Sequence, residues 1–571
     1  MNNGKIISND FFERKNKMKE KLKSLILPVA VSVPFLLLYY YLFIPAINWR
    51  SGGFWAMLVI YALVFIGCYS LSNHKGILKV IVEAAKNSAL KNTKGGNHYH
   101  DKTYSLPKKV KIALIVIASV LVAVLLLCFF TSSVVFRANR YQSMLDVKKD
   151  CDFSKDIAEL PISQIPIVDR DTAERLGNRK LGEIVELVSQ FNVSDYYSQI
   201  NYNDAPYRVS PLEYAGFLKW ISNKDEGIPY YVSIDMATQE TELVHLDSGI
   251  KYSPSEFFGR DLYRHIRFSY PTKMFENLSF EVDDNGAPYW VMSYYDYTFG
   301  IVGGKDIKGI ILVDAVTGEM KDYPVSEIPQ WIDVVYSADI LVEQADNWGS
   351  LTNGFLNSIF VQKDCVVTTE GYNYIAVDDD VWLYTGITSV VADESNIGFI
   401  LINMRTKEAK TYMINGAEEY SAMESAEGQI QEKGYVATFP ILINVADRPT
   451  YFISLKDNAG LVKAYSFVSV ADYQIVGVAD TINGAKAEYL RMLGITDSSD
   501  EKVDTTEYSG VVSDIATAVK DGNSLYYILV DTKVYVANIN VSNILPFIKS
   551  GDSIEFVADE SGKITEIKLA E

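Results

Sequence analysis

Three long apolar runs occupy much of the first 136 residues. They extend from Leu25 to Ile47, from Phe54 to Leu71 and from Ile112 to Phe136, and none contains a charged residue. A helix needs roughly 20 apolar residues to cross a lipid bilayer. The pattern therefore predicts three transmembrane helices. The bilayer is then one partner of the protein, and residues 25–136 are its membrane anchor.

A different pattern follows, in which short apolar strands alternate with polar turns and similar segments return. The segment "NDAPYRVS" at 203–210 resembles "NGAPYWVMS" at 285–293, and weaker copies stand at 447–454 and 380–384. Similar segments that return at a spacing of roughly 80 residues indicate tandem structural units.

A second motif, D/N-x-x-T-x-E, follows three of these copies and begins at Asp235, Asp314 and Asn403. The Asp or Asn side chain can accept hydrogen bonds from backbone N–H groups two residues further on, and Gly318 tolerates a left-handed turn. We therefore interpret the motif as the tip of a β-hairpin. Metal binding by its Asp and Glu residues is the less favoured alternative.

Helical patterns separate the groups of strands, at 172–190, 255–268, 331–348 and 485–493. Each unit then combines a helix with a small antiparallel sheet, so the fold class is α+β over residues 137–496. A polar linker follows at 497–507. Five short strands in 508–571 predict a small C-terminal β-barrel of the OB or SH3 type.

Charge divides the chain in the same way as hydrophobicity. Residues 1–136 carry a net charge of +12 and residues 137–571 a net charge of −31. Lys and Arg concentrate in the tail at 1–24 and in the loop at 72–111, and such segments stay in the cytoplasm. Residues 76–86 of that loop predict an amphipathic helix at the inner leaflet. Everything after about residue 137 is predicted to be extracellular, and its acidity excludes nucleic acid as a partner.

The residue types needed for catalysis are scarce. His245 and His265 are the histidines of the extracellular part, and no G-x-S-x-G, H-E-x-x-H, P-loop or C-x-x-C motif is present. Cys151 and Cys365 are either free or joined in one disulfide. A nucleophile needs a base within hydrogen-bond reach. We therefore expect no enzyme, no catalytic residue and no cofactor.

Two acidic clusters are weak candidates for calcium. Asp283 and Asn285 lie in a segment that resembles half an EF-hand loop, but Met292 stands where the loop needs a bidentate Glu. The other cluster is Asp378, Asp379 and Asp380. We favour solvated turns for both clusters and expect no metal site.

A stripe of arginines is the most distinctive positive feature of the acidic part. Arg260, Arg264 and Arg267 follow the spacing i, i+4, i+7, which puts them on one face of a predicted helix. They either pair with acidic residues of an adjacent unit or bind the phosphate groups of an external polymer or lipid. We favour the first alternative.

The order of these elements, with the hairpin sequence "VDAVTGE" at 313–319, resembles PepSY-type domains, which are small α+β modules of bacterial envelope proteins and protease propeptides. The resemblance covers residues 165–495 as four degenerate units. Longer segments such as "GRDLYRHIRFSYPTKMF" resemble uncharacterised multi-pass membrane proteins of Gram-positive bacteria that often carry a CvpA-type label. The three spans depart from the four of that labelled family. The resemblance implies a cell-envelope location.

These observations together predict a membrane-anchored, non-enzymatic interaction or scaffold protein of the cell envelope. Its partner would be another envelope protein or a wall polymer. Two alternatives remain: a regulator or inhibitor of an envelope protease that acts through the PepSY-like units, and an accessory subunit of a transport or envelope-assembly complex.

Overall fold

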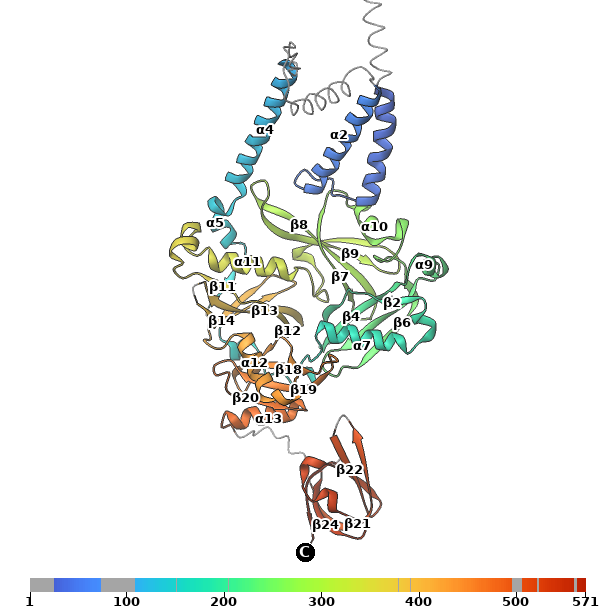
Figure 1. The fold of residues 1–571 in the computed structure, drawn as a ribbon, viewed down its shortest axis with the longest axis vertical. Helices are drawn as coiled ribbons and strands as arrows, with labels where there is room; N and C mark the ends of the chain where they lie inside the picture. Colours follow the sequence, from blue (N-terminus) through green and yellow to red (C-terminus); the bar gives the residue numbers. More distant parts are fainter. Residues whose placement is uncertain are drawn as a thin grey trace, which may run out of the picture. The chain divides into compact units, whose positions relative to one another are not determined.

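A computed structural model describes residues 25–72, 108–149, 151–203, 205–377, 379–390, 392–495, 506–520, 523–558 and 562–570. The chain divides into two compact units, residues 1–489 and 490–571 (Figure 1). The tail at 1–24, the expected amphipathic helix at 76–86 and most of the linker at 497–507 lie outside the described residues.

The described residues contain three helices that are long and apolar enough to cross a membrane: Leu25–Phe43, Gly52–Tyr69 and Ser119–Gln142. The prediction of three apolar N-terminal helices is confirmed. The helix ends differ from the expected ones for local reasons. The first helix stops at Phe43 because Pro45 disfavours a helical residue before it, and Ile44 has a φ of +39°.

The third apolar helix is built from two elements. α4 spans Lys108–Ser132 and α5 spans Val134–Gln142, and the Ser133 side chain between them accepts a hydrogen bond from the backbone N–H of Val135. A serine in this position begins a new helix. The expected single run to Phe136 is therefore interrupted.

Four sheets of mostly antiparallel strands follow along the chain. We call residues 147–489, which contain them, the four-sheet body. The sheets contain β2 to β6, β7 to β10, β1 with β11 to β15, and β16 to β20. Their strand bounds are β1 Val147–Lys148, β2 Phe191–Val193, β3 Ser198–Tyr202, β4 Ala205–Tyr214, β5 Ile228–Asp235, β6 Thr241–Ile250, β7 Met274–Val282, β8 Pro288–Phe299, β9 Gly303–Asp314, β10 Met320–Pro324, β11 Val366–Thr368, β12 Asn373–Val377, β13 Asp380–Ser389, β14 Ala392–Asn403, β15 Ala409–Tyr412, β16 Val436–Ala437, β17 Ile441–Val445, β18 Arg448–Lys456, β19 Val462–Ser469 and β20 Val476–Ala479.

Helices accompany each sheet, as the α+β prediction requires. They are α7 Arg170–Gly182, α9 Phe217–Asn223, α10 Leu262–Ser269, α11 Ala338–Ser350, α12 Glu419–Gln429 and α13 Ile482–Met492. α7 packs against strands of the first sheet, α11 against β11 and α12 against β18 and β19 (Figure 1). The segment at 147–148 was not expected in a sheet, yet β1 pairs in parallel with β15.

The hydrogen bonds in all three turns confirm the hairpin interpretation. Asp314 Oδ1 accepts hydrogen bonds from the backbone N–H groups of Val316 and Thr317 at 2.8 and 2.9 Å. Asp235 and Asn403 accept the corresponding bonds in their own hairpins. Gly318 has the expected left-handed conformation, with a φ of +76°.

The units share apolar cores. One buried cluster joins Val291 and Ile310 of the second sheet to Leu383 and Ile402 of the third, with Leu341 of α11 between them. Burial of this apolar surface is the main force that holds neighbouring sheets together. The sheets therefore do not form separate domains.

The loop after the first apolar helix is bound to the four-sheet body. Ile47 donates a backbone hydrogen bond to Pro271 O at 2.7 Å, and Arg50 forms an ion pair with Asp296 at 2.9 Å. The loop and the four-sheet body therefore lie on the same side of the apolar helices.

The C-terminal unit contains the five expected strands: β21 Thr506–Lys520, β22 Asn523–Val530, β23 Lys533–Asn538, β24 Ser553–Ala558 and β25 Ile564–Leu569. Their order is β23-β22-β21-β24-β25, which is an open sheet. An isolated parallel bridge between Val536 and Lys563 joins the two edges. The predicted small barrel of the OB or SH3 type is not confirmed for the described residues, because the strands form an open sheet and one bridge is not a continuous ladder of hydrogen bonds.

Candidate functional site

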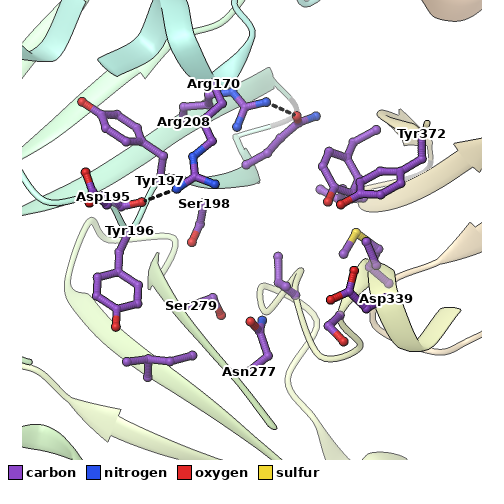
Figure 2. Close-up of a pocket in the computed structure, with 18 residues that line it drawn as sticks. Arg170, Asp195, Tyr196, Tyr197, Ser198, Arg208, Asn277, Ser279, Asp339 and Tyr372 are labelled. Atoms are coloured by element: carbon purple, nitrogen blue, oxygen red, sulfur yellow. Dashed lines mark hydrogen bonds between the residues drawn. The ribbon is translucent and has the colours of Figure 1, made fainter. Parts of the chain in front are cut away.

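A cavity of about 520 Å³ lies where the first three sheets of the four-sheet body meet. We call it the central cavity. Its lining residues come from the beginning of α7, the β2–β3 loop, β3, β4, β7, the beginning of α11 and the third sheet with its flanking residues. They are Arg170, Asp195, Tyr196, Tyr197, Ser198, Gln199, Arg208, Asn277, Leu278, Ser279, Val334, Ser337, Ala338, Asp339, Tyr372, Tyr374, Val381 and Met404. Figure 2 shows the labelled side chains around an open centre.

Arg208 is the buried cation of the central cavity. Its side chain donates to Val168 O and to Gln199 Oε1, both at 3.3 Å, and the residue is 7% exposed. Within the described part of the chain, no carboxylate lies within ion-pair distance of it. Burial lowers the pKa of Arg208, and the nearby Tyr374 and Asp169 oppose this effect. A buried charge is costly unless it is paired.

The register of the repeated sheets shows how unusual Arg208 is. Arg208 pairs with Ile234 in the first sheet, as Trp290 pairs with Val313 in the second and Leu383 with Ile402 in the third. Trp290 and Leu383 are completely buried apolar residues. The first sheet thus places a guanidinium at a position that its neighbours use for core packing.

Three residues of the cavity lining, Tyr197, Gln199 and Ser337, have a buried polar side-chain atom without a partner. Gln199 is 5% exposed, and its Oε1 accepts a hydrogen bond from Arg208. Its Nε2 has no acceptor. The hydroxyl of Ser337, at the beginning of α11, also has no partner and does not cap the helix. Most buried polar groups in proteins are hydrogen-bonded, so such exceptions need an explanation.

Asn277 reaches the central cavity because β7 is irregular. The pairing of β7 with β8 shifts between Phe275 and Leu278, so Glu276 and Asn277 have no partner in the ladder. Bulges of this kind redirect side chains and are frequent at binding sites. Figure 2 shows Asn277 and Ser279 on one side of the open centre, across from Arg170 and Arg208.

A buried pair of acids lies directly behind the cavity lining. Glu281 accepts hydrogen bonds from the Ser279 hydroxyl at 2.8 Å and from the backbone N–H groups of Asp333 at 2.9 Å and Val334 at 3.2 Å. Asp333 Oδ2 accepts from the backbone N–H of Asn201 at 2.8 Å. The acids therefore tie together the first two sheets and the segment that leads to α11.

Burial raises the pKa of both acids. Desolvation is the main cause for Glu281, and its three hydrogen bonds oppose it. Desolvation also dominates for Asp333, and the charges of Glu281, Asp380 and Asp379 raise its pKa further. Two carboxylates this close cannot both ionise without a large electrostatic cost.

The acidic residues considered for calcium have other partners. Asp283 Oδ1 accepts from the backbone N–H groups of Asn285 and Ala287, both at 2.9 Å, as a turn former does. Asp380 binds Arg405 through two bonds of 2.7 and 2.8 Å. Asp379 accepts a bond from the Asn201 amide at 3.2 Å. Asp378 lies outside the described residues. The described residues hold no group of three His, Cys, Asp or Glu placed to bind a metal.

The three arginines of the predicted stripe do not form one surface. Arg260 lies in a 3-10 turn before α10, so the prediction that all three share one helix is wrong. Arg260 forms an ion pair with Glu256 at 3.5 Å, and Arg264 forms one with Asp261 at 3.5 Å. Both acidic residues belong to the same unit as the arginines and not to an adjacent unit. Arg264 also donates to Tyr41 O of the first apolar helix at 3.3 Å, and Arg267 lies over the Phe275 ring at 4.0 Å.

The histidines and cysteines of the four-sheet body do not line the central cavity. The Nε2 atom of His265 lies 2.8 Å from Gly318 O, and His245 packs on the Tyr230 ring. Cys151 and Cys365 are both free thiols.

None of the polar residues that distinguish the central cavity was predicted from the sequence. One signal was present: the repeated segment reads Pro-Tyr-Arg at 206–208 and Pro-Tyr-Trp at 288–290. An Arg at a position where a repeat has Trp indicates a local departure from core packing.

No family model matches the chain, and no curated protein matches it. Solved structures show only distant likeness. The Bacillus megaterium YpeB C-terminal domain is 11% identical, with a TM-score of 0.10, and the match covers 42% of this chain and 100% of that one. A mutant of B. megaterium levansucrase is 10% identical, with a TM-score of 0.18, and the match covers 74% of this chain and 97% of that one. Likeness at this level carries no argument about function, and it supports neither the PepSY-type nor the CvpA-type resemblance.

Proposed function

We propose that this protein is a membrane-anchored, non-enzymatic binding protein of the bacterial cell envelope. Its four-sheet body lies outside the cell and recognises an external molecule in the central cavity. The observation that carries this proposal is the set of buried polar groups without partners at the junction of three sheets, around Arg208, Gln199 and Ser337. Cavities of this size with a few convergent polar groups are typical of ligand sites.

The contacts of the first loop support the proposed orientation. Basic residues concentrate in 1–24 and 72–111, which favours a cytoplasmic location for both segments. The loop at 44–51 between the first two helices then lies outside. Because Ile47 and Arg50 of this loop bind the four-sheet body, the body lies on the same side.

The arrangement of the cavity groups favours binding over catalysis. Ser198, Ser279 and Ser337 line the central cavity, and among the described residues none of their hydroxyls is hydrogen-bonded to an imidazole. The Ser279 hydroxyl donates to Glu281 at 2.8 Å, but this carboxylate also accepts from the backbone N–H groups of Asp333 and Val334 and so links the segments behind the cavity. A serine nucleophile needs a base that is free to accept its proton.

A second candidate, an accessory subunit of a membrane complex, is favoured by an exposed apolar segment after α11. Leu356, Phe360 and Val361 are 69%, 77% and 70% exposed. Exposed apolar clusters mark interaction surfaces. A photo-crosslinker in place of Phe360 should capture a membrane protein in cells if this candidate is right, and should capture none if it is wrong.

Labelling of single cysteines tests the orientation. In a background without the four native cysteines, an impermeant maleimide should modify an Asn458→Cys variant in intact cells, because Asn458 lies in an exposed turn of the four-sheet body. A Ser88→Cys variant in the 72–111 loop should be protected until the cells are opened. The reverse pattern would contradict the proposed function.

A further inference from the structure

We propose that the central cavity binds a small ligand through a single carboxylate, which is held by Arg208 with the help of Gln199 and Ser337. The inference rests on the proposed function and specifies the chemistry of its ligand. It requires that the ligand supply hydrogen-bond acceptors and one negative charge within reach of Arg208, where the described residues place no carboxylate.

The charge requirement follows from Arg208. Its guanidinium has two bonds to neutral oxygens, each at 3.3 Å, which are long for a charged donor. A guanidinium presents five N–H donors in a planar fork, and a carboxylate is the acceptor that matches this fork. An anion in the central cavity would therefore offset the cost of burying Arg208 at a core position.

The demand for acceptors follows from the neighbouring amide and hydroxyl. Gln199 Nε2 is a donor with no acceptor, and its orientation is settled because only the amide oxygen can accept from Arg208. The Ser337 hydroxyl stands at the beginning of the 13-residue helix α11, where the first backbone N–H groups have no partner within the helix. Together these groups favour an oxygen-rich anion.

The acids around the central cavity limit the charge of the ligand. Asp195 and Asp339 belong to the lining, and Glu281 is hydrogen-bonded to Ser279 of the lining. These groups would repel a doubly charged phosphate more than a singly charged carboxylate. Tyr196, Tyr372 and Tyr374 provide aromatic surface for the uncharged part of the ligand.

A carboxylate of this kind has two sources in an envelope, a sugar acid and the C-terminus of a short peptide. Calorimetry on the full-length protein in detergent micelles would compare two matched pairs of probes. In the first pair, N-acetylmuramate carries a carboxylate-bearing group that N-acetylglucosamine lacks. In the second pair, dialanine has a C-terminal carboxylate that is replaced by a neutral amide in dialanine amide. We expect the charged member of one pair to bind at least about tenfold more tightly than its neutral partner, since hydrogen bonds to a charged acceptor are stronger than those to a neutral one. The pair that shows this difference identifies the source.

Three variants locate the binding. Arg208→Gln should abolish the preference for the carboxylate. Because that change could disturb the fold, Ser337→Ala and Asn277→Ala provide a second test, since neither residue's side chain donates a hydrogen bond inside the described protein. Each should weaken binding severalfold without changing the melting temperature. Ser466→Ala is the matched control, because the Ser466 hydroxyl is also buried without a partner but lies in β19, outside the cavity lining.

Two results would overturn the inference. One is equal or absent binding of the charged and neutral probes at millimolar concentration. The other is unchanged affinity in Ser337→Ala and Asn277→Ala. The proposed function fails separately, through the cysteine labelling described above. Equal binding of charged and neutral probes that is still lost in Ser337→Ala would leave the binding function intact and reject only the carboxylate.

Discussion

At the scale of single residues, the buried acids Glu281 and Asp333 are the most consequential electrostatic feature. Asp333 is 1% exposed, and its Oδ1 has no partner while its Oδ2 accepts one hydrogen bond. Its pKa lies above the ordinary value of 3.8, mainly because of burial. Above about pH 3.8, Asp333 therefore keeps its proton in the folded state while it loses the proton in the unfolded state. The free energy of unfolding falls as pH rises through this range.

An Asp333→Asn variant should remove part of this pH dependence. Its amide oxygen can keep the bond from Asn201, and its NH₂ group takes the place of the unpartnered Oδ1. We expect the melting temperature of the variant to exceed that of the original protein at pH 8 and to differ little from it at pH 4, because the variant has no carboxylate to ionise at this buried position. Melting temperatures between pH 4 and pH 8 measure the effect.

Asp284→Asn is the control for this substitution, because Asp284 is an exposed acid in a turn. It should change neither the melting temperature nor its slope with pH. Parallel pH profiles for the original protein and Asp333→Asn would show that Asp333 is ionised in the folded state.

The hairpin residue Asp314 gives a second prediction at this scale. Asp314→Ala removes the acceptor of two backbone N–H groups and should lower the free energy of unfolding by about 0.5–2 kcal/mol, as loss of a side-chain cap does. Asp314→Asn should be nearly neutral, because Asn403 accepts the same two bonds at 2.8 Å in the third sheet. Calcium should not restore the Ala variant; a calcium-dependent rise in its melting temperature would contradict the turn interpretation.

At the scale of elements, comparison of the three equivalent hairpins distinguishes the effect of backbone conformation on stability from the effect of side-chain packing. Gln239, Gly318 and Lys407 occupy the same turn position with φ angles of +65°, +76° and +64°. Side chains are thus tolerated at this φ in two hairpins. Only at Gly318 does the ring of Tyr252 approach, and a Cβ atom would lie 2.4 Å from it.

Gly318→Ala should therefore destabilise the protein by about 1–3 kcal/mol, the range for overpacking. Gln239→Ala places the same residue in the same conformation, loses the contact of the Gln239 side chain with the Tyr465 hydroxyl, and should cost less than about 1 kcal/mol. Chemical denaturation of both variants distinguishes the two causes. Equal losses would indicate that the backbone conformation, and not Tyr252, requires glycine.

At the scale of the whole molecule, the division into two compact units has a testable consequence. No residue after 489 lines the central cavity, and the C-terminal unit has its own apolar core around Val512, Ile528 and Phe556. Each unit buries its own apolar surface, so each should unfold on its own.

A chain truncated after residue 495 should keep the melting transition of the four-sheet body and the probe binding of the central cavity. The truncation keeps the whole of α13, Ile482–Met492, in which Tyr489 and Leu490 are buried. Calorimetric scans of the full chain and the truncated chain would show the loss of one transition. Loss of cavity binding on truncation would mean that the two units depend on each other.

The sequence by itself determined the features that depend on local pattern. The apolar runs predicted three helices because the requirement to cross a bilayer is a matter of length and composition. The D/N-x-x-T-x-E motif predicted three hairpin tips because the side chain and the N–H groups it binds lie within three residues of each other. The α+β class followed from the alternation of such elements.

Only the tertiary structure decided which distant residues meet. Arg208, Asn277 and Ser337 come from three elements far apart in the chain, and the pairing of sheets brings them to one cavity. The partners of the three arginines also depend on contacts between residues far apart in the chain, such as that of Arg264 with Tyr41. The same holds for the open C-terminal sheet, because the local sequence pattern predicts strands but not which strands pair. The physical reason is that hydrophobic burial is non-directional: it drives the sheets together, while their packing determines which polar groups are left facing the cavity without partners.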